Sequence, residues 1–117
     1  MSEPKWIAKI GNEPTRYHST KQEKMVAKKL SGKTTINSGA TLGQNDVITD
    51  NVEVECKTTS KDSFTVKYSD WEKLRHKCGA DKMPIMVFEL QKQKKNFVLL
   101  SLEDYEYLTA LIVIQNK

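Results

Sequence analysis

The chain has 117 residues, of which 38% are hydrophobic and 29% charged, and its formal net charge is +4. We expect one domain spanning residues 1–117, and this composition excludes a disordered or fibrous protein. The longest apolar run, Ala110 to Ile114, is far shorter than the roughly 20 residues of a membrane-spanning helix. The N-terminus lacks the pattern of a secretory signal, so we expect a cytoplasmic protein with 2 free cysteines.

Basic residues are concentrated on either side of an acidic centre. Residues 1–30 hold 7 basic and 3 acidic side chains, residues 31–60 hold 2 and 4, and residues 61–95 hold 9 and 5. This distribution fits two interpretations: solvated faces of an ordinary domain, or a polyanion-binding surface around carboxylates that hold cations. Charge alone favours the first.

The N-terminal third predicts an arm followed by a helix. Residues 1–18 contain two of the 3 prolines and a short apolar pattern around Trp6 and Ile10, so we expect an arm or an edge strand. An amphipathic helix is expected from Lys21 to Leu30, capped by Ser19 or Thr20 and ended by Gly32. The β-branched stretch 34–37 follows, and then a flexible loop over residues 38–43.

The central third predicts a hairpin and a second helix. Strands over residues 46–49 and 52–59 are separated by Asp50-Asn51, a pair that favours a tight two-residue turn. Residues 64–68 alternate as a short strand. A helix capped by Ser69 or Asp70 is expected to run to about Cys78.

The C-terminal third predicts two buried strands, over residues 84–90 and 96–100, and a last helix capped by Ser101. The broad apolar stripe of that helix is expected to pack on the sheet or to extend into a symmetric partner, which favours a homodimer. Together the elements predict an α/β fold, with a mixed sheet of roughly five strands flanked by helices in the order α-β-β-β-α-β-β-α.

The hairpin register predicts a cluster of charged side chains. With a two-residue turn, Asp46 lies opposite Glu55, and Lys57 follows Glu55 on the same face of its strand. Directly opposed carboxylates repel one another and destabilise a sheet, whereas a bound cation would stabilise them. Such oxygen ligands suit Mg²⁺ or Mn²⁺, which activates water and polarises a phosphodiester.

An ordinary hairpin remains an alternative at this point. Glu53, Glu55 and Lys57 would then form its solvated face, while Val54 and Cys56 form its buried face. Alternation of residue types fits both interpretations equally well. A three-residue turn would also move Asp46 to the opposite face.

The order Asn45-Asp46 and then Glu55-Cys56-Lys57 resembles the PD-(D/E)xK signature of restriction-endonuclease-like nucleases. The preceding helix with Glu23, the Ser38-Gly39-Ala40 loop, and the later helix and strand resemble, in that order, archaeal Holliday-junction resolvases and related small phage nucleases. This similarity covers roughly residues 16–100. It implies a restriction-endonuclease-like fold and an Mg²⁺-dependent endodeoxyribonuclease in a prokaryotic or phage-infected cell.

The resemblance also implies roles for individual residues. Asp46 and Glu55 would be metal ligands, Lys57 the catalytic lysine, and Ser38 a residue near the scissile phosphate. Glu23 would be the helix acid that completes the metal site as a third ligand, directly or through metal-bound water. Glu23 fits a solvated helix carboxylate and Ser38 an ordinary turn residue equally well. Asn45 stands where the motif has proline, and Asn37 near where archaeal relatives have arginine, so a phosphate contact there is in doubt.

Branched DNA is the partner that the resemblance implies, with roles in recombination and repair. A nuclease acting on linear duplex and a non-catalytic DNA-binding module are the alternatives, since fold does not fix substrate. Some of the lysines in the basic segments are expected to contact phosphate while the others are solvated. The candidates for DNA binding are Lys21, Lys24, Lys28, Lys33 and Lys61.

Overall fold

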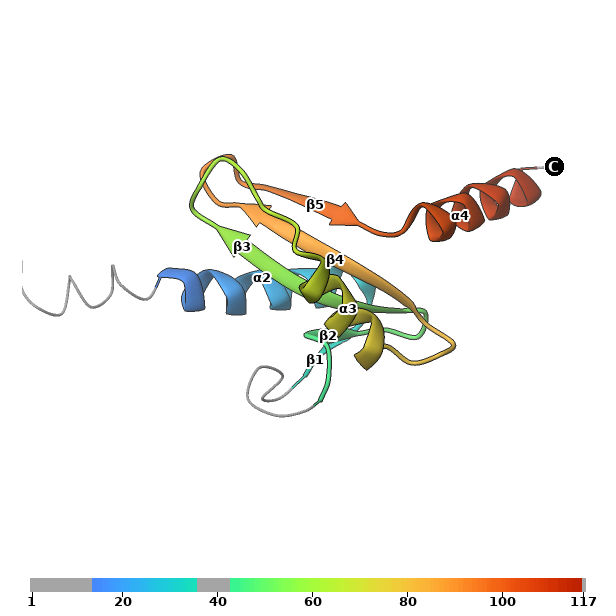
Figure 1. Ribbon diagram of the computed structural model, residues 1–117, viewed down its shortest axis with the longest axis horizontal. Helices are drawn as coiled ribbons and strands as arrows, with labels where there is room; N and C mark the ends of the chain where they lie inside the picture. The colour runs from blue at the N-terminus through green and yellow to red at the C-terminus, as the bar shows by residue number, and fades with distance from the viewer. Residues whose placement is uncertain (1–13, 36–42, 117) are drawn as a thin grey trace, which may run out of the picture.

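The protein folds as a mixed five-stranded sheet with three helices over the residues that the structure, a computed structural model, describes, namely 14–35 and 43–116 (Figure 1). The expected α/β class and the expected order of elements are both confirmed. In chain order the elements are α2 (Pro14–Leu30), β1 (Lys33–Thr34), β2 (Val47–Ile48), β3 (Val52–Thr59), α3 (Tyr68–Lys77), β4 (Met83–Leu90), β5 (Lys95–Leu99) and α4 (Leu102–Gln115).

The strands lie side by side in the order β1-β2-β3-β4-β5. Only β3 and β4 are parallel, because the chain crosses between them through α3, while every other neighbouring pair is antiparallel. Between β2 and β3, Val47 pairs with Val54 and Ile48 with Glu53. The hairpin register expected from the Asp50-Asn51 turn is therefore confirmed.

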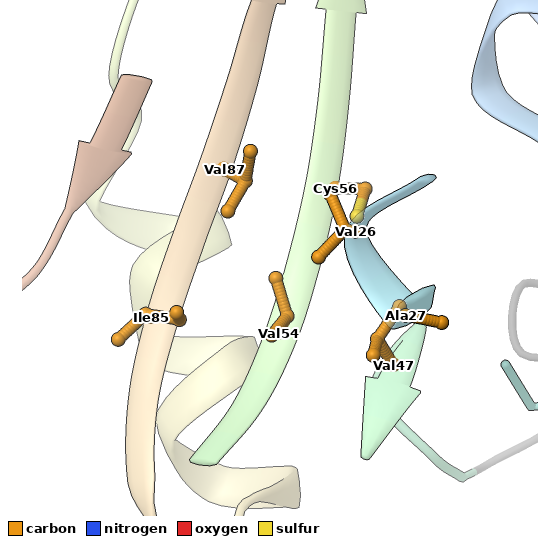
Figure 2. Packing of buried hydrophobic residues seen from close by; sticks show 7 residues of the cluster. All are labelled: Val26, Ala27, Val47, Val54, Cys56, Ile85 and Val87. Atoms are coloured by element: carbon orange, nitrogen blue, oxygen red, sulfur yellow. The ribbon is translucent and has the colours of Figure 1, made fainter. Parts of the chain in front are cut away.

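The core lies between α2 and one face of the sheet (Figure 2). Alternate residues of β3 and β4 point toward α2, as the period of two in a strand requires. The opposite face carries Glu53, Glu55 and Lys57 and faces α3. The buried apolar cluster consists of Val26, Ala27, Val47, Val54, Cys56, Ile85 and Val87.

The C-terminal end of α2 has a left-handed residue where glycine is usually found. Ser31 has a φ of 57°, and the Gly32 N–H donates to the Ala27 carbonyl at 2.8 Å, which is the pattern of a Schellman motif. Gly32 was expected to end the helix, yet its role is a close approach to β2. A Cβ added there would lie 2.7 Å from the Ile48 carbonyl oxygen.

We therefore expect Gly32→Ala to destabilise the protein by about 1–3 kcal/mol, because the new methyl group forces β2 away from the helix end. Urea unfolding followed by circular dichroism measures the change. Gly43→Ala is the matched control, since a Cβ at Gly43 meets nothing within 4 Å. Equal losses in the two variants would contradict a steric role for Gly32.

Two boundaries near the N-terminus differ from the sequence-based expectation. Helix α2 begins at Pro14, so residues 14–18 belong to it and not to an arm. Proline at the start of a helix loses no hydrogen bond, because the first N–H groups have no partner within the helix. The Trp6 and Ile10 pattern and residues 36–37 of the expected strand at 34–37 lie outside the described residues; β1 covers only Lys33–Thr34.

The segment 64–68 does not form the expected strand. Strand β3 already pairs with β2 and β4, and the Phe64 ring stacks on Phe88 with centroids 4.6 Å apart. Helix α3 then begins at Tyr68, with Lys67 at the N-cap position and no side-chain cap. Ser69 and Asp70 therefore lie inside the helix.

Helix α4 begins as expected but does not pack on the sheet. The Ser101 hydroxyl accepts a hydrogen bond from the Asp104 N–H at 3.1 Å, which confirms the predicted cap. The helix projects from one end of the molecule, and none of its residues is buried (Figure 1). In residues 14–35 and 43–116, no helix combines the length and apolar character needed to cross a membrane.

Candidate active site

Asp46 stands at the centre of the site, in the segment that leads into β2. Its carboxylate oxygen Oδ2 accepts a hydrogen bond from the backbone N–H of Cys56 at 2.8 Å, and only 9% of the residue is exposed. A side-chain hydrogen bond also joins Asp46 to Glu55. The structure thus places the two carboxyl groups together, as the hairpin register predicted.

Glu55 shows how the pair behaves near neutral pH. Burial, the hydrogen bond to Asp46 and the charge of Asp46 together raise the pKa of Glu55 to about 8, although Lys57 and Lys77 act in the opposite direction. Two adjacent carboxyl groups cannot both ionise easily, so the pair keeps one proton. A divalent cation is the natural replacement for that proton.

Glu23, on helix α2, lies near enough to Asp46 for the charge of Asp46 to act on it. Burial and the negative charge of Asp46 raise the pKa of Glu23 to about 7. Its neighbour Gln22 fixes this part of α2, because the Gln22 amide Nε2 donates to the backbone carbonyls of Lys57 at 2.8 Å and Val87 at 3.2 Å. Gln22 therefore anchors the turn of α2 that contains Glu23 to strands β3 and β4.

Lys57 extends from the same face of β3 as Glu55. Its Nζ lies 3.9 Å from Asp70 Oδ2 in α3, and both side chains are partly exposed. Its charge acts on Glu55, which it favours in the ionised form. The sequence suggested Asp70 only as a helix cap, so its pairing with Lys57 is a contact that the sequence pattern did not indicate.

A buried polar network supports the segment that carries Asp46. The Asn45 amide Nδ2 donates to Glu53 Oε1 at 2.9 Å, and the Gly79 N–H donates to Glu53 Oε2 at 2.9 Å. Asn45 is completely buried and Glu53 is 6% exposed. The alternative in which Glu53 belongs to a solvated hairpin face is therefore wrong, because Glu53 binds the ends of two other segments.

Cys56 points into the core, as its position between Glu55 and Lys57 predicted. Burial and the charges of Asp46, Glu23 and Glu55 all raise the pKa of its thiol far above the usual range. A thiolate, and not a thiol, is the reactive form of cysteine. Cys56 therefore stabilises the fold and is not a nucleophile.

The candidate DNA-binding lysines are all exposed. Lys21, Lys24 and Lys28 lie three and four residues apart on α2 and so share one face of that helix. Lys33 is in β1 and Lys61 follows β3. Ser38 and Asn37 lie outside the described residues, so the expected position of Ser38 near the scissile phosphate stays a prediction.

The carboxyl groups match the donor set of a Mg²⁺ site. Within residues 14–35 and 43–116, no three His, Cys, Asp or Glu side chains stand close enough together to hold a metal ion, so Glu23 is not brought together with Asp46 and Glu55 as a third ligand. Mg²⁺ does not require a third, since it is commonly held by one or two carboxylates and keeps water and phosphate oxygens as its other ligands. Asp46 and Glu55 fit that requirement.

The chain was compared with protein families, curated proteins and solved structures. No family model matches it, and neither a curated protein nor a solved structure matches it. The resemblance to PD-(D/E)xK nucleases thus stays a prediction that rests on the order and spacing of the quoted residues.

Proposed function

We propose that the protein is a Mg²⁺-dependent DNA endonuclease with a restriction-endonuclease-like fold, and that it acts in the cytoplasm of a prokaryotic or phage-infected cell. The observation that carries the proposal is the hydrogen-bonded carboxyl pair of Asp46 and Glu55, with Lys57 beside it on the same strand face. Two carboxylates held together at an energetic cost indicate a site for a divalent cation. Mn²⁺ would serve as well as Mg²⁺, since both prefer oxygen ligands.

Each residue of the site has a separate task. Asp46 and Glu55 would hold the ion, which supplies Lewis acidity toward the phosphodiester and lowers the pKa of water. Lys57 would orient the attacking water or stabilise the negative charge that develops on the phosphate oxygens. Glu23, whose pKa of about 7 lies near neutral pH, would complete the site and accept a proton.

Branched DNA is the substrate that we propose, bound by a homodimer. Exposed lysines on α2, β1 and the loop after β3 supply phosphate contacts, which contribute most of the affinity of DNA-binding proteins. A symmetric pair of active sites would allow the two cuts that resolution of a four-way junction needs. The proposed enzyme is therefore a Holliday-junction resolvase.

The decisive experiment incubates the purified chain with a four-way junction, a fork, linear duplex and single strands, each with Mg²⁺, Mn²⁺ or EDTA. We expect symmetric paired nicks in the junction, in the presence of either metal and not in EDTA. Cleavage of linear duplex and of the junction at equal rates would indicate a repair or restriction-type nuclease and would contradict the resolvase assignment. Binding of DNA without cleavage of any substrate would indicate a non-catalytic DNA-binding module and would contradict the proposed enzymatic activity.

A further inference from the structure

Helix α4 carries an apolar surface that residues 14–35 and 43–116 of its own chain leave uncovered. It contains no buried residue, although most of its side chains are apolar. These side chains surround the helix instead of forming one narrow stripe, so burial against a single flat surface would not cover them. The large exposed apolar residues of α4 are Leu102, Tyr105, Tyr107, Leu108, Leu111, Ile112, Val113 and Ile114.

An apolar groove lies between α4 and the end of the sheet. Its volume is about 820 Å³, and its walls come from α4 on one side and from β4, β5 and the residues next to them on the other. Ile85 belongs to the core cluster, and Met83 and Leu100 pack against that cluster. A side chain that enters the groove would thus continue the hydrophobic core. The sheet wall includes Met83, Ile85, Val98 and Leu100.

We propose that the groove is filled by α4 of a second copy of the chain, so that two copies exchange their last helices. This inference specifies the homodimer of the proposed function but does not depend on its chemistry. The groove and the helix that fits it belong to the same chain, as an isologous two-fold interface requires. Each α4 would then lie between the partner's α4 and the partner's sheet.

The exposed area of α4 matches what a stable dimer needs. Its eight large apolar side chains are 36–73% exposed, which corresponds to on the order of 900 Å² of accessible surface. A standard protein–protein interface buries roughly 800 Å² per partner, whereas the largest apolar patch of a typical monomer is about 300–600 Å². The helix surface alone therefore reaches the size of a dimer interface.

The charges of α4 favour a protein partner over DNA or an anionic membrane. Glu103, Asp104 and Glu106 lie in its first half, and residues 102–116 contain no lysine or arginine. Acidic side chains repel phosphate, while a helix that binds anionic lipid usually carries basic residues. The groove wall contains one basic side chain, Lys82, and two acidic ones, Asp81 and Asp104, so the fit of an incoming helix rests on the apolar residues of the wall and not on its charge.

Light scattering of the full chain tests the proposal. We expect a mass twice the 13.4 kDa of one chain at micromolar concentration. Leu111→Glu, which places a charge inside the groove, should weaken the dimer about 100-fold. Ile112→Glu is a second variant that should have the same effect. Val66→Glu is the matched control, because Val66 is also an exposed apolar residue, 46% exposed, but does not belong to α4. Circular dichroism verifies that each variant is folded.

A mixed sample of ¹³C-labelled and unlabelled chains locates the contact. We expect intermolecular NOEs between the methyl groups of Leu111 and Ile85. A wild-type chain that is monomeric would overturn the proposal, whether or not residues 1–13 of the same chain cover α4. A dimer that Leu111→Glu leaves intact would overturn it as well. Co-sedimentation of a monomer with phosphatidylcholine and phosphatidylglycerol vesicles would identify a lipid surface instead and would also overturn it.

The dimer and the nuclease can fail separately. Asp46→Asn removes a proposed metal ligand and should leave the mass of the dimer unchanged. Leu111→Glu should yield a folded monomer that retains the carboxyl pair. An inactive dimer would therefore contradict only the metal-dependent chemistry of the proposed function. A wild-type chain that cleaves DNA as a monomer would contradict the homodimer and the helix exchange but not that chemistry.

Discussion

Asp46→Asn and Glu55→Gln are each expected to lower the rate of Mg²⁺-dependent DNA cleavage by at least roughly 1,000-fold. Each substitution keeps the size of the side chain but removes the negative charge that would hold the ion. DNA affinity should change by less than about threefold, because lysine–phosphate contacts supply most of it. Gel assays of junction cleavage and fluorescence anisotropy without metal measure the two quantities.

Asp50→Asn is the matched control for these variants. It makes the same change from carboxylate to amide in the same hairpin. Asp50, however, lies in the exposed turn, and no hydrogen bond among the described residues joins it to Asp46 or Glu55. We expect full activity from it. A parallel loss of binding and cleavage in Asp46→Asn would mean that Asp46 supports the fold or the DNA surface and not the chemistry.

The hairpin was predictable because two independent signals agree on its register. Asp50-Asn51 selects a tight turn, and the alternation after it assigns Val54 and Cys56 to the buried face. Once that register is fixed, Asp46, directly before β2, is brought next to Glu55, and the hydrogen bond from the Cys56 N–H holds its carboxylate there. This is the part of the candidate site that local sequence determines.

The remaining parts of the site depend on contacts between distant segments. From the alternation along β3 alone, Glu53 could equally be a solvent-exposed residue. It is buried because Asn45 and Gly79, from two other segments, lie against its carboxylate. The pairing of Lys57 with Asp70 likewise depends on where the α3 crossover sets the helix. An alternating pattern specifies which face a residue occupies but not what covers that face.

The same dependence on distant contacts explains why the sequence did not predict what covers α4. An apolar helix surface indicates that something must cover it, and the sequence left its own sheet and a second copy as alternatives. The described chain excludes the first, because no α4 residue is buried. The fold class, by contrast, follows from the alternation of helical and strand periods, which is a local property.

The stability of the metal-free protein is expected to fall as pH rises from about 5 to 8. The pKa of Glu55 rises from 4.5 to about 8 on folding, so in this range the folded chain keeps a proton that the unfolded chain has released. Folding then takes up a proton, and the free energy of unfolding decreases by at most about 1.4 kcal/mol per pH unit for that one proton. Glu23, with its pKa of about 7, contributes in the same direction.

Mg²⁺ should reverse this loss, since it binds the ionised carboxylates and stabilises only the folded chain. We expect little stabilisation by Mg²⁺ at pH 6, where protons occupy Glu55 and Glu23, and a clear gain at pH 8 to 9. Urea unfolding at each pH, with Mg²⁺ or with EDTA, measures both effects without any nuclease assay. Glu55→Gln should weaken the pH dependence and abolish the Mg²⁺ gain, because the amide neither titrates nor carries the charge that attracts the ion. Stabilisation by Mg²⁺ of equal size at pH 6 and pH 9 would place the ion elsewhere on the protein.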